Sequence, residues 1–564
     1  MSNQQQVEKV IVNIDGIDVP VPKGTNIIEA AALVNTEIPH YCYHPKLTVP
    51  GNCRMCLIEM GMAMKDRATG QPILESDGTP KIGWIPRPAI ACATQAAPGM
   101  YIKTKSELVK NCQKGVMEFL LINHPLDCPI CDQAGECRLQ EFSIEYGRGY
   151  SRFVENKIVK PKRTLIGPRV MLDDERCILC SRCIRFCQEV VHDDVLGFID
   201  RGSYSTLTTY PGKQLDNNYS LNTVDICPVG ALTSTDFRFK MRVWFLKKTN
   251  SICTESSVGV NTEVWSREGI IYRITPRRND DVNDTWMSDS GRELYKLIES
   301  ENRLRKARSH GVAISLDEAH IRCAEILPTG KTVYIGSSHM SVEEQFLFKD
   351  LIVQHPGEVY WVSHVDEGDN LLISSDRTPN LRGALITGLI KDVPVDNLDN
   401  LAKLIENGEV QNIIVYHEDL TRYGISESQL KKLNVIYLGT HVNPTSEVAR
   451  IAIPTLMVFE KSGTFVNQQF RLQKFVQAVP GPIGIMPDIN TLNRIISLLK
   501  KENDTFSSIK LIWRQMQSSI PQLRDLSFET IPDGGILLNA EDYGAFDFPE
   551  GKTLHFEAKT KSQV

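Results

Sequence analysis

Cysteine is the residue type whose spacing in this sequence could support chemistry. It occurs 15 times in 564 residues, and 13 of the cysteines lie at or before Cys227. Disulfides are rare in large cytosolic chains, because that compartment keeps thiols reduced. Thiolates held close together are instead ligands for zinc or iron–sulfur clusters. The crowding therefore predicts metal ligation in the N-terminal part of the chain.

The first group of cysteines has a close pair between two more distant members: Cys42, Cys53, Cys56 and Cys92. The close pair follows Gly51 and Asn52, which favour a loop. A [2Fe–2S] cluster takes four thiolates, two on each iron. The cysteine order resembles that of plant-type ferredoxins, although the first spacer is longer and the last contains an insertion at residues 64–84. A zinc site is the alternative for the same side chains.

The second group places a histidine four residues before three cysteines: His124, Cys128, Cys131 and Cys137. One histidine with three cysteines also suits zinc. As ligands of a [4Fe–4S] cluster, they would carry one negative charge fewer than four thiolates, and net charge is one control on cluster potential. Cys112 is the nearest further cysteine. It lies in a helical stretch among apolar residues and is predicted to be an inert core thiol.

The third group resembles the cysteine run of bacterial ferredoxins: Cys177, Cys180, Cys183 and Cys187, with the distant Cys227. In that run the cysteine before a proline serves a second cluster. Here the proline follows Cys227, so Cys177, Cys180, Cys183 and Cys227 are predicted to hold one [4Fe–4S] cluster. A partner run would need cysteines where Asn217, Ser220 and Thr223 stand. Cys187 is therefore predicted to be a buried structural thiol.

The elements that must position these groups follow from local patterns. Residues 9–22 predict a β-hairpin turning at Asp15-Gly16, with Thr25 capping a helix over 26–34. Residues 105–122 predict an amphipathic helix. Beyond residue 310, β-rich runs alternate with a helix over Ser341–His355, which predicts a parallel sheet. The runs are Thr332–Ile335, Val359–Val362, Ile413–Tyr416 and Val435–Leu438.

Composition and charge exclude several classes of protein. Hydrophobic residues make up 41% and charged residues 23%, and the net charge is −6, without a long basic block. Nucleic acid is therefore not an expected partner. No apolar stretch of about 18 residues is present, so the chain is not expected to span a membrane by itself. The N-terminus lacks an apolar signal core, which predicts a cytoplasmic protein.

Three segments of the cysteine groups together resemble the large iron–sulfur subunit of respiratory complex I, the proton-pumping NADH–quinone oxidoreductase. It is known as the G subunit in bacteria and the 75 kDa subunit in mitochondria. The segments are NHPLDCPICDQAGECRLQ at 123–140, CILCSRCIRF at 177–186 and DICPVGALT at 225–233. The resemblance implies a relay that accepts electrons from flavin subunits that oxidise NADH and passes them towards quinone-module subunits. It also implies a peripheral position on the cytoplasmic face of the bacterial inner membrane.

Some members of that family carry a fourth cluster on four cysteines. This chain has Cys253, Ser256, Val260 and Ser288 at the corresponding positions, so no fourth cluster is expected. The C-terminal part resembles molybdopterin-dependent oxidoreductases through ARIAIP at 449–454, EKSGTFVN at 460–467 and RLQ at 471–473. Cys323 stands alone in a helical stretch and cannot complete a metal site. No molybdopterin is therefore expected, and this domain is predicted to be a scaffold.

The sequence predicts a multidomain α+β and α/β protein. The predicted parts are a plant-type [2Fe–2S] ferredoxin-like domain (1–104), a small [4Fe–4S] domain with one histidine and three cysteine ligands (105–145), a [4Fe–4S] ferredoxin-like domain (146–245), a degenerate fourth-cluster segment (246–300), a truncated molybdopterin-oxidoreductase-like domain (301–540) and a loosely ordered polar tail (541–564).

The predicted function is one-electron relay as a subunit of an oxidoreductase, with no complete active site and no catalytic residue in this chain. Neither a nucleotide-binding Gly-x-Gly-x-x-Gly after a strand nor a Walker A motif is evident. Two alternatives remain. One is an electron-transfer subunit of a soluble NAD-linked hydrogenase or formate dehydrogenase. The other is a zinc-stabilised scaffold without a redox role.

Overall fold

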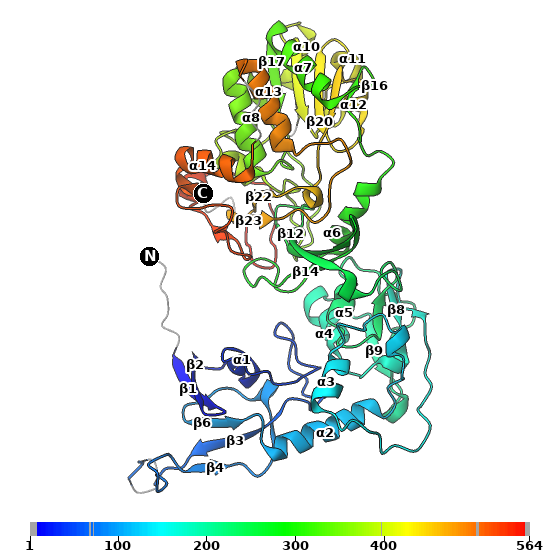
Figure 1. Cartoon of the computed structure of the whole chain (residues 1–564), viewed down its shortest axis with the longest axis vertical. Helices are drawn as coiled ribbons and strands as arrows, with labels where there is room; N and C mark the ends of the chain where they lie inside the picture. The colour runs from blue at the N-terminus through cyan, green and yellow to red at the C-terminus, as the bar shows by residue number, and fades with distance from the viewer. Residues whose placement is uncertain (1–7, 67–68, 72, 396, 503–506, 559–564) are drawn as a thin grey trace. The chain divides into compact units, whose positions relative to one another are not determined.

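The chain divides into two units, residues 1–244 and 245–564, in a computed structural model (Figure 1). The structure describes residues 8–66, 69–71, 73–395, 397–502 and 507–558. The division lies next to the predicted boundary after residue 245. All three predicted cluster sites belong to the first unit.

The N-terminal part of the first unit is a mixed sheet with strand order β2-β1-β6-β3-β4, in which β5 also pairs with β3. The predicted hairpin is confirmed, because β1 and β2 pair through their whole length and turn at Asp15 and Gly16, both with positive φ. Val10, Val12 and Ile14 are buried at alternate positions, as a half-buried strand requires. The strands are β1 (Lys9–Ile14), β2 (Ile17–Pro22), β3 (Leu57–Ala63), β4 (Ile82–Trp84), β5 (Ala89–Ile90) and β6 (Met100–Lys103).

Helix α1 (Ile27–Ala32) begins one residue later than the sequence predicts. The proposed cap at Thr25 is wrong: the side-chain oxygen of Asn26 accepts a hydrogen bond from Glu29 N at 3.0 Å, while Thr25 Oγ1 donates to the carbonyl of Pro22. Both residues favour the cap position, and Asn26 occupies it because its backbone is the last extended one before the helix.

The rest of the first unit consists of short elements joined by long loops. Helix α2 (Glu107–Leu121) confirms the predicted helix, and the hydroxyl of Ser106 caps it. Helix α3 (Arg138–Tyr146) packs against α2. The remaining elements are β7 (Thr164–Leu165), β8 (Val170–Leu172), α4 (Arg182–Phe186), β9 (Leu196–Ile199), β10 (Thr206–Thr209), α5 (Asn222–Asp225) and β11 (Leu232–Ser234).

The second unit is built around a seven-stranded sheet in which β21, β20, β19, β17 and the edge strand β18 are parallel. The predicted strands and the helix within this region are confirmed to within about two residues. Alternate residues of β19 enter two hydrophobic cores: Ile414 packs with α7, α8 and α13, whereas Ile413 packs with α10 and α11. The strands are β15 (Arg308–Ser309), β16 (Val312–Ala313), β17 (Thr332–Ile335), β18 (Glu358–Tyr360), β19 (Asn412–Tyr416), β20 (Asn434–Gly439) and β21 (Ile451–Pro454).

Helices cover both faces of this sheet, and two smaller sheets complete the unit. The helices are α6 (Asp289–Glu293), α7 (Leu316–Ile326), α8 (Val342–Gln354), α9 (Leu381–Ile386), α10 (Asp399–Glu406), α11 (Glu427–Leu430), α12 (Pro444–Glu447), α13 (Asp488–Lys500) and α14 (Ile509–Ser519). The smaller sheets contain β12 (Lys247–Ile252), β13 (Asn261–Arg267) and β14 (Ile270–Pro276), and β22 (Gly463–Val466), β23 (Arg471–Phe475) and β24 (Ile536–Leu537). Within the described ranges, no helix is both long and apolar enough to cross a membrane.

The expectation of a loosely ordered tail is wrong for residues 541–558. The guanidinium of Arg382, which is fully buried, pairs with Asp376 and with Glu550 and lies 4.1 Å from the ring centre of Phe548. Thr553 is also buried. These contacts join the segment to distant parts of the chain, which local composition does not reveal. Residues 559–564 of the predicted tail lie outside the described residues.

We expect Glu550→Ala to loosen this segment, because it leaves part of the buried Arg382 guanidinium without an acceptor. An unsatisfied buried donor costs about 1–3 kcal/mol. The amides of residues 541–558 should therefore be less protected from hydrogen exchange in Glu550→Ala than in the wild-type chain. Glu557→Ala is the matched control, since Glu557 pairs with Lys552 at the surface and should leave protection unchanged. Equal protection in both variants would contradict the role given to Glu550.

Candidate iron–sulfur sites

The first site forms where the loop before β3 meets the short helical turn Ala91–Ala93. Its four thiols form two hydrogen-bonded pairs, Cys42 with Cys53 and Cys56 with Cys92. The hydrogen bond from Cys42 lowers the pKa of Cys53 to about 5, and the bond from Cys56 likewise lowers the pKa of Cys92. Two pairs of sulfurs suit two irons with two thiolates each, so these residues fit a [2Fe–2S] cluster.

The backbone around the first site also supplies N–H groups. Those of Tyr41 and Met55 lower the pKa of Cys53, because they favour the thiolate over the thiol. Gly51 and Arg54, on either side of Asn52 and Cys53, have positive φ. N–H groups aimed at sulfur are among the levers that set cluster potentials.

The second site lies between α2 and α3. Cys128 begins a short helical turn, and Cys137 directly precedes α3. Burial is the main cause that raises the pKa of Cys131 and of Cys137, the latter to about 11, and the charge of Cys128 adds to both shifts. Cys128 itself is exposed. The structure thus gathers the three thiols around one place.

His124, four residues before Cys128 in the chain, is a neutral imidazole. Burial, followed by the charges of Lys157 and Arg176, lowers the pKa of His124 to about 4. Arg176 also acts on Cys131, so the imidazole and that thiol share one charged neighbour. A metal ligand must be deprotonated, which this histidine is at neutral pH. In the described part of the chain, no three His, Cys, Asp or Glu side chains surround a position for a single metal ion.

The third site is a small cavity lined by all four predicted ligands, Cys177, Cys180, Cys183 and Cys227. Leu179 and Ser181, which lie between the first three cysteines, have left-handed backbones. Apolar side chains form much of the remaining wall, so burial raises the pKa of each thiol. A cavity with four inward thiols and apolar walls fits a [4Fe–4S] cluster.

Cys187 does not line this cavity. It is 1% exposed at the start of a π-helical turn, and burial together with Asp193 and Asp194 raises its pKa to about 12. Two of the positions where a second cluster would need cysteines instead hydrogen-bond to each other: Thr223 Oγ1 donates to the carbonyl of Ser220 at 2.7 Å. Cys112 is half-buried in α2, and Cys323 is fully buried in α7.

The second and third sites are neighbours, joined by two residues that the sequence does not single out. The Cα of Gly230 lies against Cys131, where an added Cβ would stand 2.2 Å from the sulfur. Arg176 donates to Asp127, Asp173 and the carbonyl of Gly230. Only long-range contacts reveal these roles, although Gly230 stands within the quoted 225–233 segment.

The candidate fourth site does not fit a cluster. Cys253 is buried, and its amide donates to the carbonyl of Val260. Ser288 Oγ donates to the carboxylate of Glu255 at 2.6 Å and caps α6. A Cβ on Gly291 would lie 2.7 Å from the sulfur of Cys253, so helix backbone fills the adjacent space. One thiol among serine hydroxyls and a valine cannot replace four thiolates.

The polar residues of the molybdopterin-like segment bind other protein groups. Lys461 contacts the carboxylates of Glu344 and Asp488, each at 2.7 Å. Glu460 pairs with the buried Arg303. These contacts make the segment part of the packing of the second unit.

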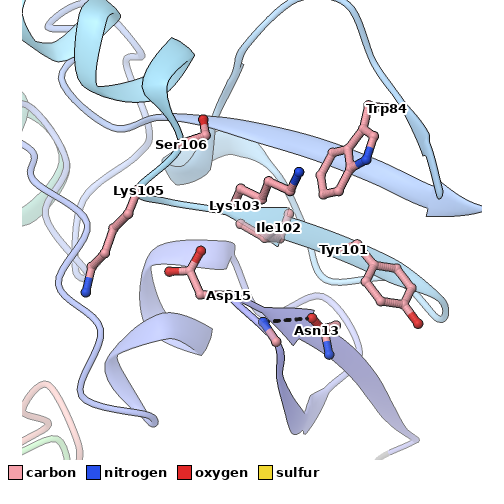
Figure 2. A pocket seen from close by; sticks show the side chains of 9 residues that line it. Asn13, Asp15, Trp84, Tyr101, Ile102, Lys103, Lys105 and Ser106 are labelled. Carbon is pink, nitrogen blue, oxygen red and sulfur yellow. Dashed lines mark hydrogen bonds between the residues drawn. The ribbon is translucent and has the colours of Figure 1, made fainter. Parts of the chain in front are cut away.

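A separate pocket in the first unit contains none of the predicted ligands (Figure 2). Trp84, Tyr101 and Lys103 form one wall, and the ammonium of Lys103 lies 4.1 Å from the ring centre of Trp84. The carboxylate of Asp15 accepts from the amide and the hydroxyl of Thr104, which fixes the hairpin turn at the pocket edge.

Comparison with known families divides the chain much as its motifs do. The matching families are described as "2Fe-2S iron-sulfur cluster binding domain" (residues 7–80), "NADH-ubiquinone oxidoreductase-G iron-sulfur binding region" (113–152), "NADH-quinone oxidoreductase subunit 3, ferredoxin-like domain" (167–233), "NADH-ubiquinone oxidoreductase NDSU1/NuoG-like, 4Fe-4S domain" (246–296) and "Molybdopterin oxidoreductase" (383–497). The predicted fold class is confirmed: this is a multidomain protein of the iron–sulfur class, with ferredoxin-like domains and a molybdopterin-oxidoreductase-like domain.

Within that class, the chain is a homologue of the large iron–sulfur subunit of NADH–quinone oxidoreductase, which confirms the resemblance. The G subunit of NADH-quinone oxidoreductase from Rickettsia conorii is 39% identical over 362 residues, which are 63% of this chain and 50% of that protein. The Rickettsia prowazekii protein of the same name is 35% identical over 431 residues, 74% of this chain and 60% of its own length. The mitochondrial NADH dehydrogenase [ubiquinone] iron-sulfur protein 1 of Solanum tuberosum is 39% identical over 359 residues, 62% of this chain and 45% of its own.

The chain thus spans about half the length of the curated relatives it matches. Among solved structures, an NAD+-reducing [NiFe]-hydrogenase chain has 27% identity and a TM-score of 0.34, and the match covers 42% of this chain and 91% of that one.

We expect Gly230→Ala to prevent a cluster from assembling at the second site, because the new methyl group would stand 2.2 Å from the Cys131 sulfur and displace it. Iron should fall by about four per chain, the content of one [4Fe–4S] cluster. Gly115→Ala in α2 is the matched control, since nothing lies within 4 Å of its added Cβ. Iron and sulfide analysis decides the result, and unchanged iron in Gly230→Ala would contradict the close packing on Cys131.

Proposed function

We propose that this chain is an electron-relay subunit of the proton-pumping NADH–quinone oxidoreductase. The observation that supports the proposal is the cavity lined by Cys177, Cys180, Cys183 and Cys227, in the same unit as two further groups of neighbouring thiols. The proposed ligands are Cys42, Cys53, Cys56 and Cys92 for one [2Fe–2S] cluster; His124, Cys128, Cys131 and Cys137 for one [4Fe–4S] cluster; and Cys177, Cys180, Cys183 and Cys227 for a second.

Clusters at these sites would store and transfer electrons one at a time. The chain's own residues set the conditions. The neutral His124 reduces the negative charge of the second ligand set, whereas the third set consists of four thiols in an apolar cavity. Arg176 adds positive charge beside Cys131. Different charge and polarity at each site would give the clusters different potentials, as a relay needs.

The proposed partners are the flavin subunits that oxidise NADH and the quinone-module subunits of the complex. We place the chain on the cytoplasmic face of the bacterial inner membrane, where it would contact the membrane only through those partners. The second unit is proposed to act as a scaffold without molybdopterin, and the Cys253 position without a cluster.

Two single-thiol variants of the full chain test this assignment. Cys183→Ser should remove the third cluster, whereas Cys253→Ser should leave about ten irons per chain, the content of one [2Fe–2S] and two [4Fe–4S] clusters. EPR after dithionite reduction should show loss of one [4Fe–4S] signal only in Cys183→Ser. Loss of iron in Cys253→Ser would contradict the proposal that no cluster binds at the Cys253 position. Folded protein that contains zinc but no inorganic sulfide would contradict the relay and favour a zinc-stabilised scaffold without a redox role.

A further inference from the structure

Arg182 connects the backbones beside two different cluster sites. Its Nη1 donates to the carbonyl of Ile226 at 3.1 Å, and its Nη2 donates to the carbonyl of Tyr43. Ile226 precedes a ligand of the third site, and Tyr43 follows a ligand of the first. One planar guanidinium therefore holds both backbones and fixes the spacing of the two sites. Two hydrogen bonds from separate, flexible side chains would fix this spacing less well.

The Nε–H of this guanidinium has no partner in the described protein. Arg182 Nε is buried, and no acceptor within the described residues takes its hydrogen. Arg182 is also the one charged residue among those lining the cavity of the third site. A buried donor is costly when unsatisfied. Sulfur of a cluster in that cavity would provide the missing acceptor, since hydrogen bonds to sulfur are common to such sites.

Arg185 has a different arrangement, although it lies one helical turn away. Its Nη2 donates to the carbonyl of Cys42 at 2.6 Å, its Nε donates to Ser181 Oγ at 3.2 Å, and its Nη1 donates to the carbonyl of Thr48. Arg185 does not line the cavity. It anchors the loop of the first site entirely through protein acceptors, so the free donor distinguishes Arg182.

We propose that Arg182 is a positioning residue shared by the first and third clusters, holding their spacing and donating its Nε–H to the third. The inference rests on the proposed function, because it requires clusters at both sites. A positive charge and a hydrogen bond favour the reduced, more negative state of a cluster. The midpoint potential of the third cluster is therefore raised by Arg182, and that of the first cluster is raised to a smaller extent.

An EPR-monitored redox titration of the reconstituted full chain tests the proposal. Iron and sulfide are measured first: their absence from the wild-type chain would refute the relay itself. With clusters present, Arg182→Gln should lower the midpoint of the third cluster by about 59 mV, a tenfold change in its one-electron equilibrium, and that of the first cluster by less. Arg201→Gln, which removes an exposed arginine of the same unit, should shift neither. Equal potentials in both variants at full iron content would overturn the proposal.

A second measurement keeps the proposal testable if Arg182→Gln fails to assemble its clusters. In wild-type chain labelled with 15N-arginine, pulsed EPR of the third cluster should show coupling to an arginine nitrogen. Arg182→Lys, which keeps the charge but lacks the Nε–H, should lose this coupling. The midpoint potential of its third cluster should lie between those of the wild-type chain and Arg182→Gln. Absence of arginine coupling in the wild-type chain would overturn the hydrogen bond to the cluster.

Discussion

Thiols crowded into an apolar interior resist ionisation, and the arrangement of the first unit counters this resistance. Burial raises the pKa of Cys183 well above its usual value, and the charges of neighbouring thiols raise it further. A cluster ligand must nevertheless lose its proton. Positive charges from Arg176 near Cys131, and from Arg182 and Arg185 near Cys180, favour the thiolates. These arginines therefore serve to favour the thiolate form of the ligands and not to stabilise the helices and loops that carry them.

The same arginines explain how short helices and long loops form one unit. The side chains of Arg182 and Arg185 extend from α4 and donate to carbonyls in the loop of the first site, about 140 residues earlier in the chain. Arg176 joins Asp127 of the second site to Gly230 beside the third. Charge-assisted hydrogen bonds thus position the sites where regular secondary structure is sparse. The second unit differs, because alternating apolar strands between two layers of helices stabilise it.

Local patterns in the sequence predict what depends on local interactions. The hairpin at 9–22 and the strand at Thr332–Ile335 follow from residue alternation and turn residues, and the three ligand groups follow from cysteine spacing. The free Nε–H of Arg182 and the Glu550 contact with Arg382 join distant segments, so spacing gives no signal for them. The sequence places the helix cap one residue too early because Thr25 and Asn26 both suit that position, and only the backbone conformation separates them.

The most direct test of the relay is Mössbauer spectroscopy of the full chain reconstituted with 57Fe. The account predicts that roughly one fifth of the iron belongs to [2Fe–2S] and roughly four fifths to [4Fe–4S], the proportions of one small and two large clusters. It also predicts that dithionite reduces both fractions. Folded protein that retains zinc and lacks inorganic sulfide, or a spectrum without a [2Fe–2S] component, would contradict it.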